Sequence, residues 1–301
     1  MTPAGGVDGQ VLAGGGRLVA YANFVKVAHT VFSLPFAFVG VAAASRVHAV
    51  TLRALLLVVA AFGAARFAAM GFNRIADRRL DALNPRTAGR ELPAKRLSLA
   101  EAWVLVVVTS GLFVAASALL NPLCLVLSPV ALVWVTTYSY AKRFTSLSHL
   151  WLGAGMAISP VGGYLAVTGT WSTPWWLILL LALVVICWGG GFDVLYSLQD
   201  EQFDREHELR SFTVRLGPGT ALAAARWLHV ASAVALVAFG LAAGFGAWYF
   251  AGVVVAVGLL VWEHRLVRPN DYSRLDAAFF SMNGIISAAV AAGAVADAVL
   301  R

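Results

Sequence analysis

Two short stretches of the sequence place carboxylate and amide side chains about one helical turn apart. In the first stretch, Asn73, Asp77 and Asp81 follow one another at intervals of four residues. Because an α-helix has about 3.6 residues per turn, these three side chains would share one helix face. Oxygen ligands of this kind suit Mg²⁺ better than zinc or copper, and protein-bound Mg²⁺ usually bridges to phosphate oxygens.

The second stretch, residues 189–211, contains a longer row of acidic residues. Asp193, Tyr196, Asp200 and Asp204 lie at offsets of zero, three, seven and eleven, which predicts one face of a continuous helix. Two such clusters at the edge of a membrane require a compensating cation, because unpaired charges near lipid are costly. Together with the nearby arginines and lysines, the clusters predict a diphosphate held by Mg²⁺ between two Asp-rich helices.

A simpler interpretation of the two stretches stays open at this point. Arg74, Arg78 and Arg79 lie beside Asp77 and Asp81 in the sequence and could neutralise them. The clusters would then be solvated helix ends with no ligand.

The composition predicts an all-α, polytopic membrane protein. Of 301 residues, 60% are hydrophobic and 12% are charged, and the mean hydropathy is +0.80. A soluble domain would have about 25% charged residues. The net charge is +7, and no basic stripe lies outside the loops between the membrane spans. Nucleic acid is therefore not expected as a partner. Cys124 and Cys187 lie inside apolar runs and predict neither a disulfide nor a metal site.

Nine runs are long and apolar enough to cross a bilayer as helices. They cover residues 27–46, 50–72, 98–119, 122–141, 149–168, 174–192, 220–243, 246–262 and 277–298. Ser98 and Glu101 predict a capping box at the start of the third run, and Thr173-Pro174 predicts the start of the sixth. Residues 1–20 are expected to be a disordered tail, and residues 21–301 a single transmembrane domain.

The basic residues predict the orientation of these spans. Arginine and lysine are concentrated in the loops after spans two, four, six and eight, and the opposite loops have few. The positive-inside rule therefore places the N-terminus and these four loops in the cytoplasm, in a multi-pass protein of the inner membrane. Both acidic stretches end even-numbered spans, so they are expected to face each other. Of the 15 acidic residues, only Asp297 falls clearly on the outer side.

With these motifs on these spans, the sequence resembles the UbiA family of intramembrane prenyltransferases. The first stretch matches its NxxxDxxxD motif and the second its DxxYxxxDxxxD motif. Residues 84–94, 138–153 and 29–38 also look similar, the last to the 4-hydroxybenzoate polyprenyltransferase-like branch. The resemblance covers about residues 20–300 and implies a bundle of nine transmembrane helices.

The resemblance also implies roles for individual residues. Two Mg²⁺ ions would be held on a polyprenyl diphosphate, one by Asn73, Asp77 and Asp81 and the other by Asp200 and Asp204. Further residues are candidates for binding the diphosphate, the acceptor or a cationic intermediate: Lys26, His29, Arg79, Arg90, Tyr138, Tyr140, Lys142, Arg143, Tyr196 and Arg210. Asp193 is a candidate for orienting the acceptor or removing a proton.

The implied reaction transfers the polyprenyl group to an aromatic acid similar to 4-hydroxybenzoate, in quinone biosynthesis. One alternative is the same chemistry on 1,4-dihydroxy-6-naphthoate, in the futalosine route to menaquinone. An intramembrane CDP-alcohol phosphotransferase would need an Asp-Gly-x-x-Ala-Arg signature, which the sequence does not contain. A secondary transporter is an alternative from another class, although transporters place their charges near the bilayer midplane. The sequence determines neither the prenyl chain length nor the oligomeric state.

Overall fold

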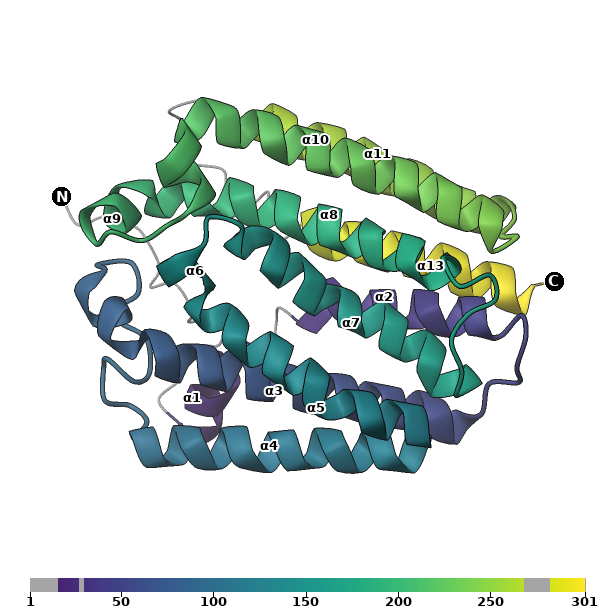
Figure 1. The fold of residues 1–301 in the computed structure, drawn as a ribbon, viewed down its shortest axis with the longest axis horizontal. Coiled ribbons are helices and arrows are strands. Elements are labelled where there is room, and N and C mark those ends of the chain that lie inside the picture. Colours follow the sequence, from purple (N-terminus) through teal and green to yellow (C-terminus); the bar gives the residue numbers. More distant parts are fainter. Residues whose placement is uncertain (1–15, 27–29, 268–281, 301) are drawn as a thin grey trace.

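The computed structural model describes residues 16–26, 30–267 and 282–300, and within these residues it contains helices and no strand. Figure 1 shows the helices running roughly along one common direction. The elements are α1 (Arg17–Phe24), α2 (Thr30–Ala44), α3 (Leu52–Leu83), α4 (Leu99–Leu120), α5 (Pro122–Thr137), η2 (Tyr138–Tyr140), α6 (Ala141–Phe144), α7 (Ser148–Thr168), α8 (Leu177–Ser197), η3 (Leu198–Asp200), α9 (Glu201–Glu206), α10 (Phe212–Ala242), α11 (Ala247–Leu266) and α13 (Asn283–Val299).

The described helices confirm the polytopic membrane class. Seven of them are long and apolar enough to cross a bilayer, and two shorter apolar helices cover Phe32–Ala44 and Asn283–Val299. In chain order, the seven and the two correspond to the nine predicted spans. Large apolar side chains, such as Val104, Val126 and Trp227, are exposed on the outer surface, as a lipid-facing bundle requires.

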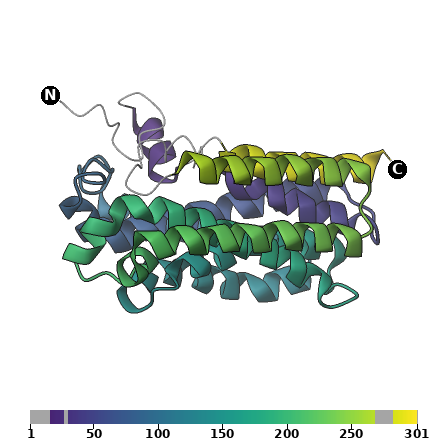
Figure 2. The same cartoon turned by 90° about the horizontal axis from the view of Figure 1, so that it is seen from above.

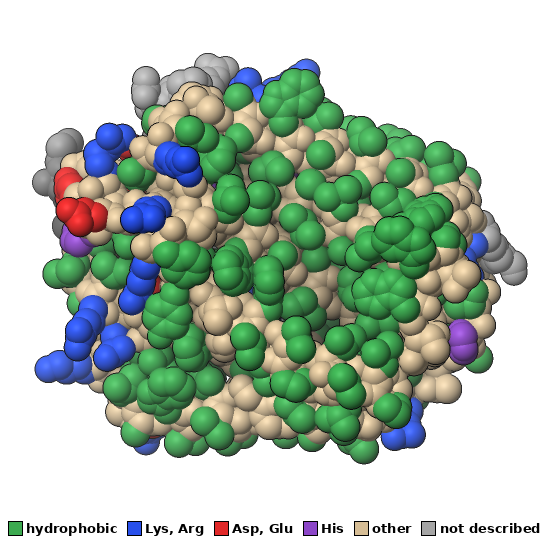
Figure 3. All heavy atoms as spheres, in the orientation of Figure 1, with side chains coloured by type: hydrophobic (Ala, Val, Ile, Leu, Met, Phe, Trp, Pro, Cys, Tyr) green, Lys and Arg blue, Asp and Glu red, His purple; other side chains and the backbone are tan. Residues whose placement is uncertain are grey.

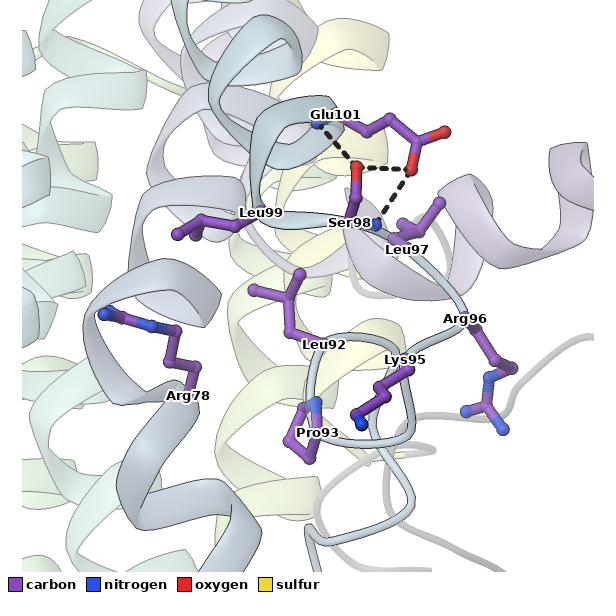
Figure 4. A pocket seen from close by; sticks show the side chains of 9 residues that line it. All are labelled: Arg78, Leu92, Pro93, Lys95, Arg96, Leu97, Ser98, Leu99 and Glu101. Carbon is purple, nitrogen blue, oxygen red and sulfur yellow. Dashed lines mark hydrogen bonds between the residues drawn. The ribbon is translucent and has the colours of Figure 1, made fainter.

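The ends of several spans differ from those predicted. Helix α3 continues to Leu83, well beyond the predicted end at residue 72, so the first acidic stretch belongs to the same helix. The capping box of Ser98 and Glu101 is confirmed and can be followed in Figure 4. Helix α8 begins at Leu177, so Thr173-Pro174 lies in the preceding loop and does not cap it.

The second acidic stretch is not one continuous α-helix, contrary to prediction. It begins on α8, passes through the 3₁₀ turn η3, and ends on α9, so that Asp193, Asp200 and Asp204 lie on three different elements. Short 3₁₀ turns are frequent at the ends of α-helices, and their tighter winding changes the direction of every later side chain.

The polar segments gather at one end of the bundle. In Figures 1 and 2 the end of α3, the α6 and α9 segments and the start of α10 lie at one end of the bundle, and the end of α13 lies at the other. Figure 3 shows basic and acidic side chains crowded at that same end, with apolar side chains over most of the remaining face.

Close backbone contacts hold the centre of the bundle together. Helix α7 packs against both α2 and α8, and a Cβ added at Gly163 would overlap the carbonyl oxygen of Ala37 on α2. A Cβ at Gly40 would likewise overlap the carbonyl oxygen of Pro160 on α7. Such small residues let membrane helices approach closely, and van der Waals packing then stabilises the pair.

Helix α1 lies partly within the predicted tail. It begins at Arg17, so residues 17–20 are helical rather than disordered. Arg17 forms an ion pair with Glu101 at the start of α4. The chain is therefore in contact with the bundle earlier than the composition predicted.

Asp297 lies at the end opposite the acidic stretches, where it caps a helix. Its Oδ2 accepts hydrogen bonds from the backbone N–H groups of Gly246, at 2.5 Å, and Tyr249, at 3.2 Å. These are N–H groups that a helix start leaves without an intrahelical partner. Asp297 therefore connects α13 to the first turn of α11. This structural role explains why one acidic residue lies at this end of the bundle.

We expect Asp297→Ala to destabilise the protein by about 1–3 kcal/mol, because it leaves one buried and one partly buried N–H group without their acceptor. The measurement is thermal unfolding in detergent. Asp297→Asn keeps an acceptor oxygen at the same place and should lose clearly less stability than Asp297→Ala. Equal losses in the two variants would show that the hydrogen bonds contribute little.

Candidate active site

The first acidic stretch contacts the segment that follows α5. Asn73 donates from Nδ2 to Asp77 Oδ2, at 3.0 Å, and to Ser139 Oγ, at 3.4 Å. Arg143, on α6, lies with Nη2 3.4 Å from Asp77 Oδ1 and also donates to the Ala76 carbonyl. The η2–α6 segment thus presents a hydroxyl and a guanidinium to the carboxylate face of α3.

Asp81 is enclosed by the loop that follows α3. Its Oδ1 pairs with Arg90 Nη1 at 2.6 Å, and its backbone carbonyl accepts from Thr87 Oγ1. Asp81 is only 6% exposed, and among the described residues its Oδ2 has no hydrogen-bond partner. A buried carboxylate oxygen normally has a partner, so this atom is suited to bind a cation.

Asp200 joins the second acidic stretch to the same loop. Arg86 donates to both of its carboxylate oxygens, from Nη2 to Oδ2 at 2.6 Å and from Nε to Oδ1 at 3.1 Å. Arg86 also donates to the Tyr196 hydroxyl at 2.8 Å, and Asn84 Nδ2 lies 3.4 Å from Asp200 Oδ1. One bidentate arginine therefore connects the second stretch to the loop that follows the first.

Asp204 faces the α6 segment from the other side. Lys142 Nζ lies 3.4 Å from its Oδ2, and Asp204 is 2% exposed. The backbone N–H of Arg210 donates to the Lys142 carbonyl at 2.7 Å, which fixes the loop after α9 against α6. The side chain of Arg210 is exposed and donates to the Phe144 carbonyl, so it does not reach an acidic group.

Four aspartates of the two stretches each pair with a different basic residue from another segment. The pairs are Asp77–Arg143, Asp81–Arg90, Asp200–Arg86 and Asp204–Lys142. These partners are not the neighbouring arginines that the interpretation as solvated helix ends required. Arg74 donates to the Phe24 carbonyl and Arg78 to the Ile75 carbonyl, while Arg79 is exposed.

The remaining acidic residue of the second stretch has a different partner. Asp193 Oδ2 lies 2.6 Å from Nδ1 of His149, near the start of α7. Asp193 is thus paired with an imidazole, whereas the other four aspartates are paired with Arg or Lys.

The other predicted site residues are not members of the four carboxylate–cation pairs. Lys26 is buried but follows α1 in a left-handed conformation, with φ of 50°, so it does not lie on the face of a transmembrane helix as predicted. His29 lies outside the described residues. Arg143 stacks on the ring of Tyr140, with 4.8 Å between the guanidinium carbon and the ring centroid. Tyr138 is on the same η2 turn.

Two residues that the motifs did not single out contact the site. Arg86 had a signal, because it lies in the basic loop after the first stretch. His149 had no signal beyond its position at the start of a span, since its partner is 44 residues away.

The donor set fits Mg²⁺ better than a metal enclosed by protein ligands. Among the described residues, no group of three His, Cys, Asp or Glu side chains is arranged to hold a metal ion. Mg²⁺ is usually bound by one or two carboxylates, with waters and substrate phosphates completing the octahedron. Asp77 and Asp81 with Asn73, and Asp200 and Asp204, match that requirement.

A separate pocket lies beside the loop after α3. Its volume is about 510 Å³, and Figure 4 shows its lining residues. The Arg78 guanidinium in that view is directed away from Lys95 and Arg96. The pocket therefore does not form a second convergent site for an anion, and none of the paired aspartates lines it.

We expect Arg86→Lys to reduce activity and raise the Mg²⁺ concentration needed for half-maximal rate. Lysine keeps the charge but cannot bind both oxygens of Asp200. Loss of a residue that orients a metal-binding carboxylate typically costs about 10–100-fold in metal affinity or activity. A Mg²⁺ titration measures the effect, with Arg205→Lys as the matched control, because Arg205 is exposed and pairs with Glu201 on its own helix. An unchanged Mg²⁺ dependence would contradict this role.

Comparison with known proteins identifies relatives of this chain. Residues 33–285 match the sequence model of the UbiA prenyltransferase family. A 4-hydroxybenzoate octaprenyltransferase from Nitrosomonas europaea is 30% identical over 239 residues, covering 78% of this chain and 79% of the relative. Another, from Alkalilimnicola ehrlichii, is 31% identical over 230 residues, covering 76% and 77%.

Two solved structures are similar. The apo structure of a UbiA homolog from Aeropyrum pernix K1 has a TM-score of 0.82 at 37% identity, covering 89% of this chain and 98% of that one. A UbiA homolog from Archaeoglobus fulgidus bound to DMAPP and Mg²⁺ has a TM-score of 0.71 at 16% identity, covering 94% and 100%. The second similarity is one of fold.

Proposed function

The chain belongs to the UbiA prenyltransferase family, and we propose that it is a Mg²⁺-dependent enzyme that moves a polyprenyl group from polyprenyl diphosphate to an aromatic acid. The proposed acceptor is 4-hydroxybenzoate or a close analogue, in quinone biosynthesis. Relatives named 4-hydroxybenzoate octaprenyltransferase support this acceptor. The observation that carries the proposal is that two acidic stretches lie at one end of an apolar bundle, with four of their aspartates each paired with an Arg or Lys from another segment.

The carboxylates would hold the metal on the diphosphate. Asn73, Asp77 and Asp81 would bind one Mg²⁺, and Asp200 and Asp204 a second. When bound, Mg²⁺ acts as a Lewis acid that neutralises the charge developing on the leaving diphosphate.

The basic residues would supply the rest of the diphosphate site. Arg86, Arg90, Lys142 and Arg143 are already held beside the carboxylates at 2.6–3.4 Å. A diphosphate entering between the two stretches offers these four side chains anionic oxygens at short range. Charge-assisted hydrogen bonds of this kind stabilise the leaving group most as its negative charge grows.

The acceptor would lie beside the η2–α6 segment. The Arg143 side chain is 41% exposed and stacks on Tyr140, which leaves it accessible to a carboxylate on an aromatic acid. Tyr138, Tyr140 and Tyr196 could stabilise an allylic cation through their ring faces. The C–O bond to the diphosphate breaks, the aromatic ring forms a bond to the allylic carbon, and a ring proton is lost.

The bundle would also determine where the reaction takes place. The polyprenyl tail needs an apolar environment, and the site lies where the bundle changes from apolar to charged. By the positive-inside rule, this end faces the cytoplasm, with the N-terminus on the same side and the protein in the inner membrane. The segment from residue 21 onwards would act as one domain.

The test is a radiolabelled transfer assay with detergent-purified protein. Geranyl diphosphate and longer prenyl diphosphates are offered with 4-hydroxybenzoate or 1,4-dihydroxy-6-naphthoate, with Mg²⁺ or with EDTA. Mg²⁺-dependent product with 4-hydroxybenzoate is expected. Product with only the naphthoate would assign the alternative acceptor. No ionisation of any prenyl diphosphate by folded protein would refute the proposal and make a transport assay the next experiment.

A further inference from the structure

A histidine–aspartate pair lies beside the carboxylate–cation pairs without being one of them. Asp193 Oδ2 and His149 Nδ1 are 2.6 Å apart, which is typical of a charge-assisted hydrogen bond. The two residues come from α8 and α7, two helices that approach closely, since a Cβ at Gly153 would overlap the Ile186 carbonyl oxygen. His149 is 2% exposed, so its ring is held by the bundle.

When Asp193 is ionised, its oxygens can only accept a hydrogen bond, so Nδ1–H of His149 is the donor in this pair. Among the described residues, Nε2 is buried without a hydrogen-bond partner. The imidazole ring is therefore held through Nδ1 against one carboxylate oxygen of Asp193.

Asp193 also differs electrostatically from the four other aspartates. Each of those has a guanidinium or ammonium as its partner, and in the proposed function each also binds Mg²⁺. Asp193 is instead paired with an imidazole and is not among the residues proposed to hold Mg²⁺. A carboxylate that is committed neither to a metal ion nor to an Arg or Lys partner can accept a proton during the reaction.

The position of Asp193 agrees with that role. Its side chain is 20% exposed, a value between those of Asp77 and Asp200 at 27% and 13%, so a substrate can reach it. Its partner His149 lies in the first turn of α7, which packs against both η2 and α6, the segment where the acceptor is proposed to bind.

We propose that Asp193 is the base that accepts the ring proton of the acceptor, and that His149 is the positioning residue that holds its carboxylate. This inference rests on the proposed function. The ring π electrons form the new C–C bond, and the diphosphate leaves with the electron pair of the C–O bond. The C–H electron pair then returns to the ring while its proton moves to the Asp193 oxygen that does not face His149. Water removes this proton before the next turnover.

Two readouts separate proton removal from binding of the diphosphate. Transfer is measured with 4-hydroxybenzoate carrying hydrogen or deuterium at the ring positions beside the hydroxyl. Ionisation is measured independently as the exchange of ¹⁸O between bridging and non-bridging positions of labelled geranyl diphosphate. The enzymes are wild type, Asp193→Asn, His149→Gln and His149→Phe.

We expect Asp193→Asn to lower transfer by about 10²–10⁴-fold, the usual contribution of a general base. Oxygen exchange should continue, and ring deuterium should now slow the reaction, because proton removal has become the slow step. His149→Phe should show the same isotope effect with a smaller loss. His149→Gln can still donate to Asp193 and should lie closest to wild type.

Specific outcomes would overturn the inference. If Asp193→Asn loses oxygen exchange and transfer together, with no isotope effect, Asp193 acts on the diphosphate instead. If it keeps the wild-type transfer rate, Asp193 is not the base. If wild-type protein transfers to neither aromatic acid, the proposed function fails and this inference fails with it. Oxygen exchange in a variant also shows that its site is folded.

Discussion

Replacing Asp77 or Asp200 by alanine is expected to reduce prenyl transfer by about 10²–10³-fold or more, since metal stabilisation of a leaving group supplies several kcal/mol. Each substitution removes one proposed metal ligand from one of the two stretches. It also leaves a cation, Arg143 or Arg86, without its carboxylate partner. Both halves of the site should be needed, because the diphosphate is proposed to lie between them.

The measurement is the transfer rate at saturating prenyl diphosphate over a range of Mg²⁺ concentrations. Glu201→Ala is the matched control, because Glu201 follows Asp200 directly but pairs with the exposed Arg205 on the same helix. Its rate should stay close to wild type. A fully active Asp77→Ala or Asp200→Ala protein would show that the acidic stretches are structural.

The second large effect concerns folding. Gly163→Leu is expected to prevent the native packing of α2 on α7, because even a Cβ at this position overlaps the Ala37 carbonyl oxygen. Gly163→Ala should cost about 1–3 kcal/mol, as overpacking of a tight interface usually does. The affected atom is backbone, so the two helices must separate to make room.

Gly162 offers a control in the adjacent position. A Cβ added there meets no atom within 4 Å. Gly162→Ala should be neutral or slightly stabilising, because alanine favours a helix over glycine by about 1 kcal/mol. Thermal unfolding in detergent, together with the yield of monodisperse protein, compares the two alanine variants. Equal stability of the two would mean that the α2–α7 contact is less close than the structure shows.

The membrane class, the approximate number of spans and the gathering of charged groups at one end of the bundle could be predicted without a structure. These properties depend on the local run length of apolar residues and on the distribution of Arg and Lys along the chain. The spacing within the first stretch also correctly predicted a shared helix face, because Asn73, Asp77 and Asp81 lie on one uninterrupted helix. The metal and the substrate class followed from side-chain chemistry and the family resemblance, and stay proposals for this chain.

The predictions that were wrong depended on local backbone geometry. Periodicity extended the second stretch along one helix, whereas the chain passes through a 3₁₀ turn before Asp204. Lys26 was predicted on the face of the first span, but it follows α1 with a left-handed backbone, outside the described helices. Single turns of this kind have weak sequence signals, because tertiary contacts outweigh the small difference in local free energy.

The partners of the site residues could come only from the folded chain. Arg86 and Asp200 are 114 residues apart, and Lys142 and Asp204 are 62 apart. His149 was indistinguishable from any histidine in a span until α7 was packed against α8. Local spacing determines which side chains share a helix face, whereas the crossing of helices determines which faces meet. The sequence therefore specified the carboxylates of this protein, and the packing of its helices specified which of them pair with a cation and which one faces an imidazole.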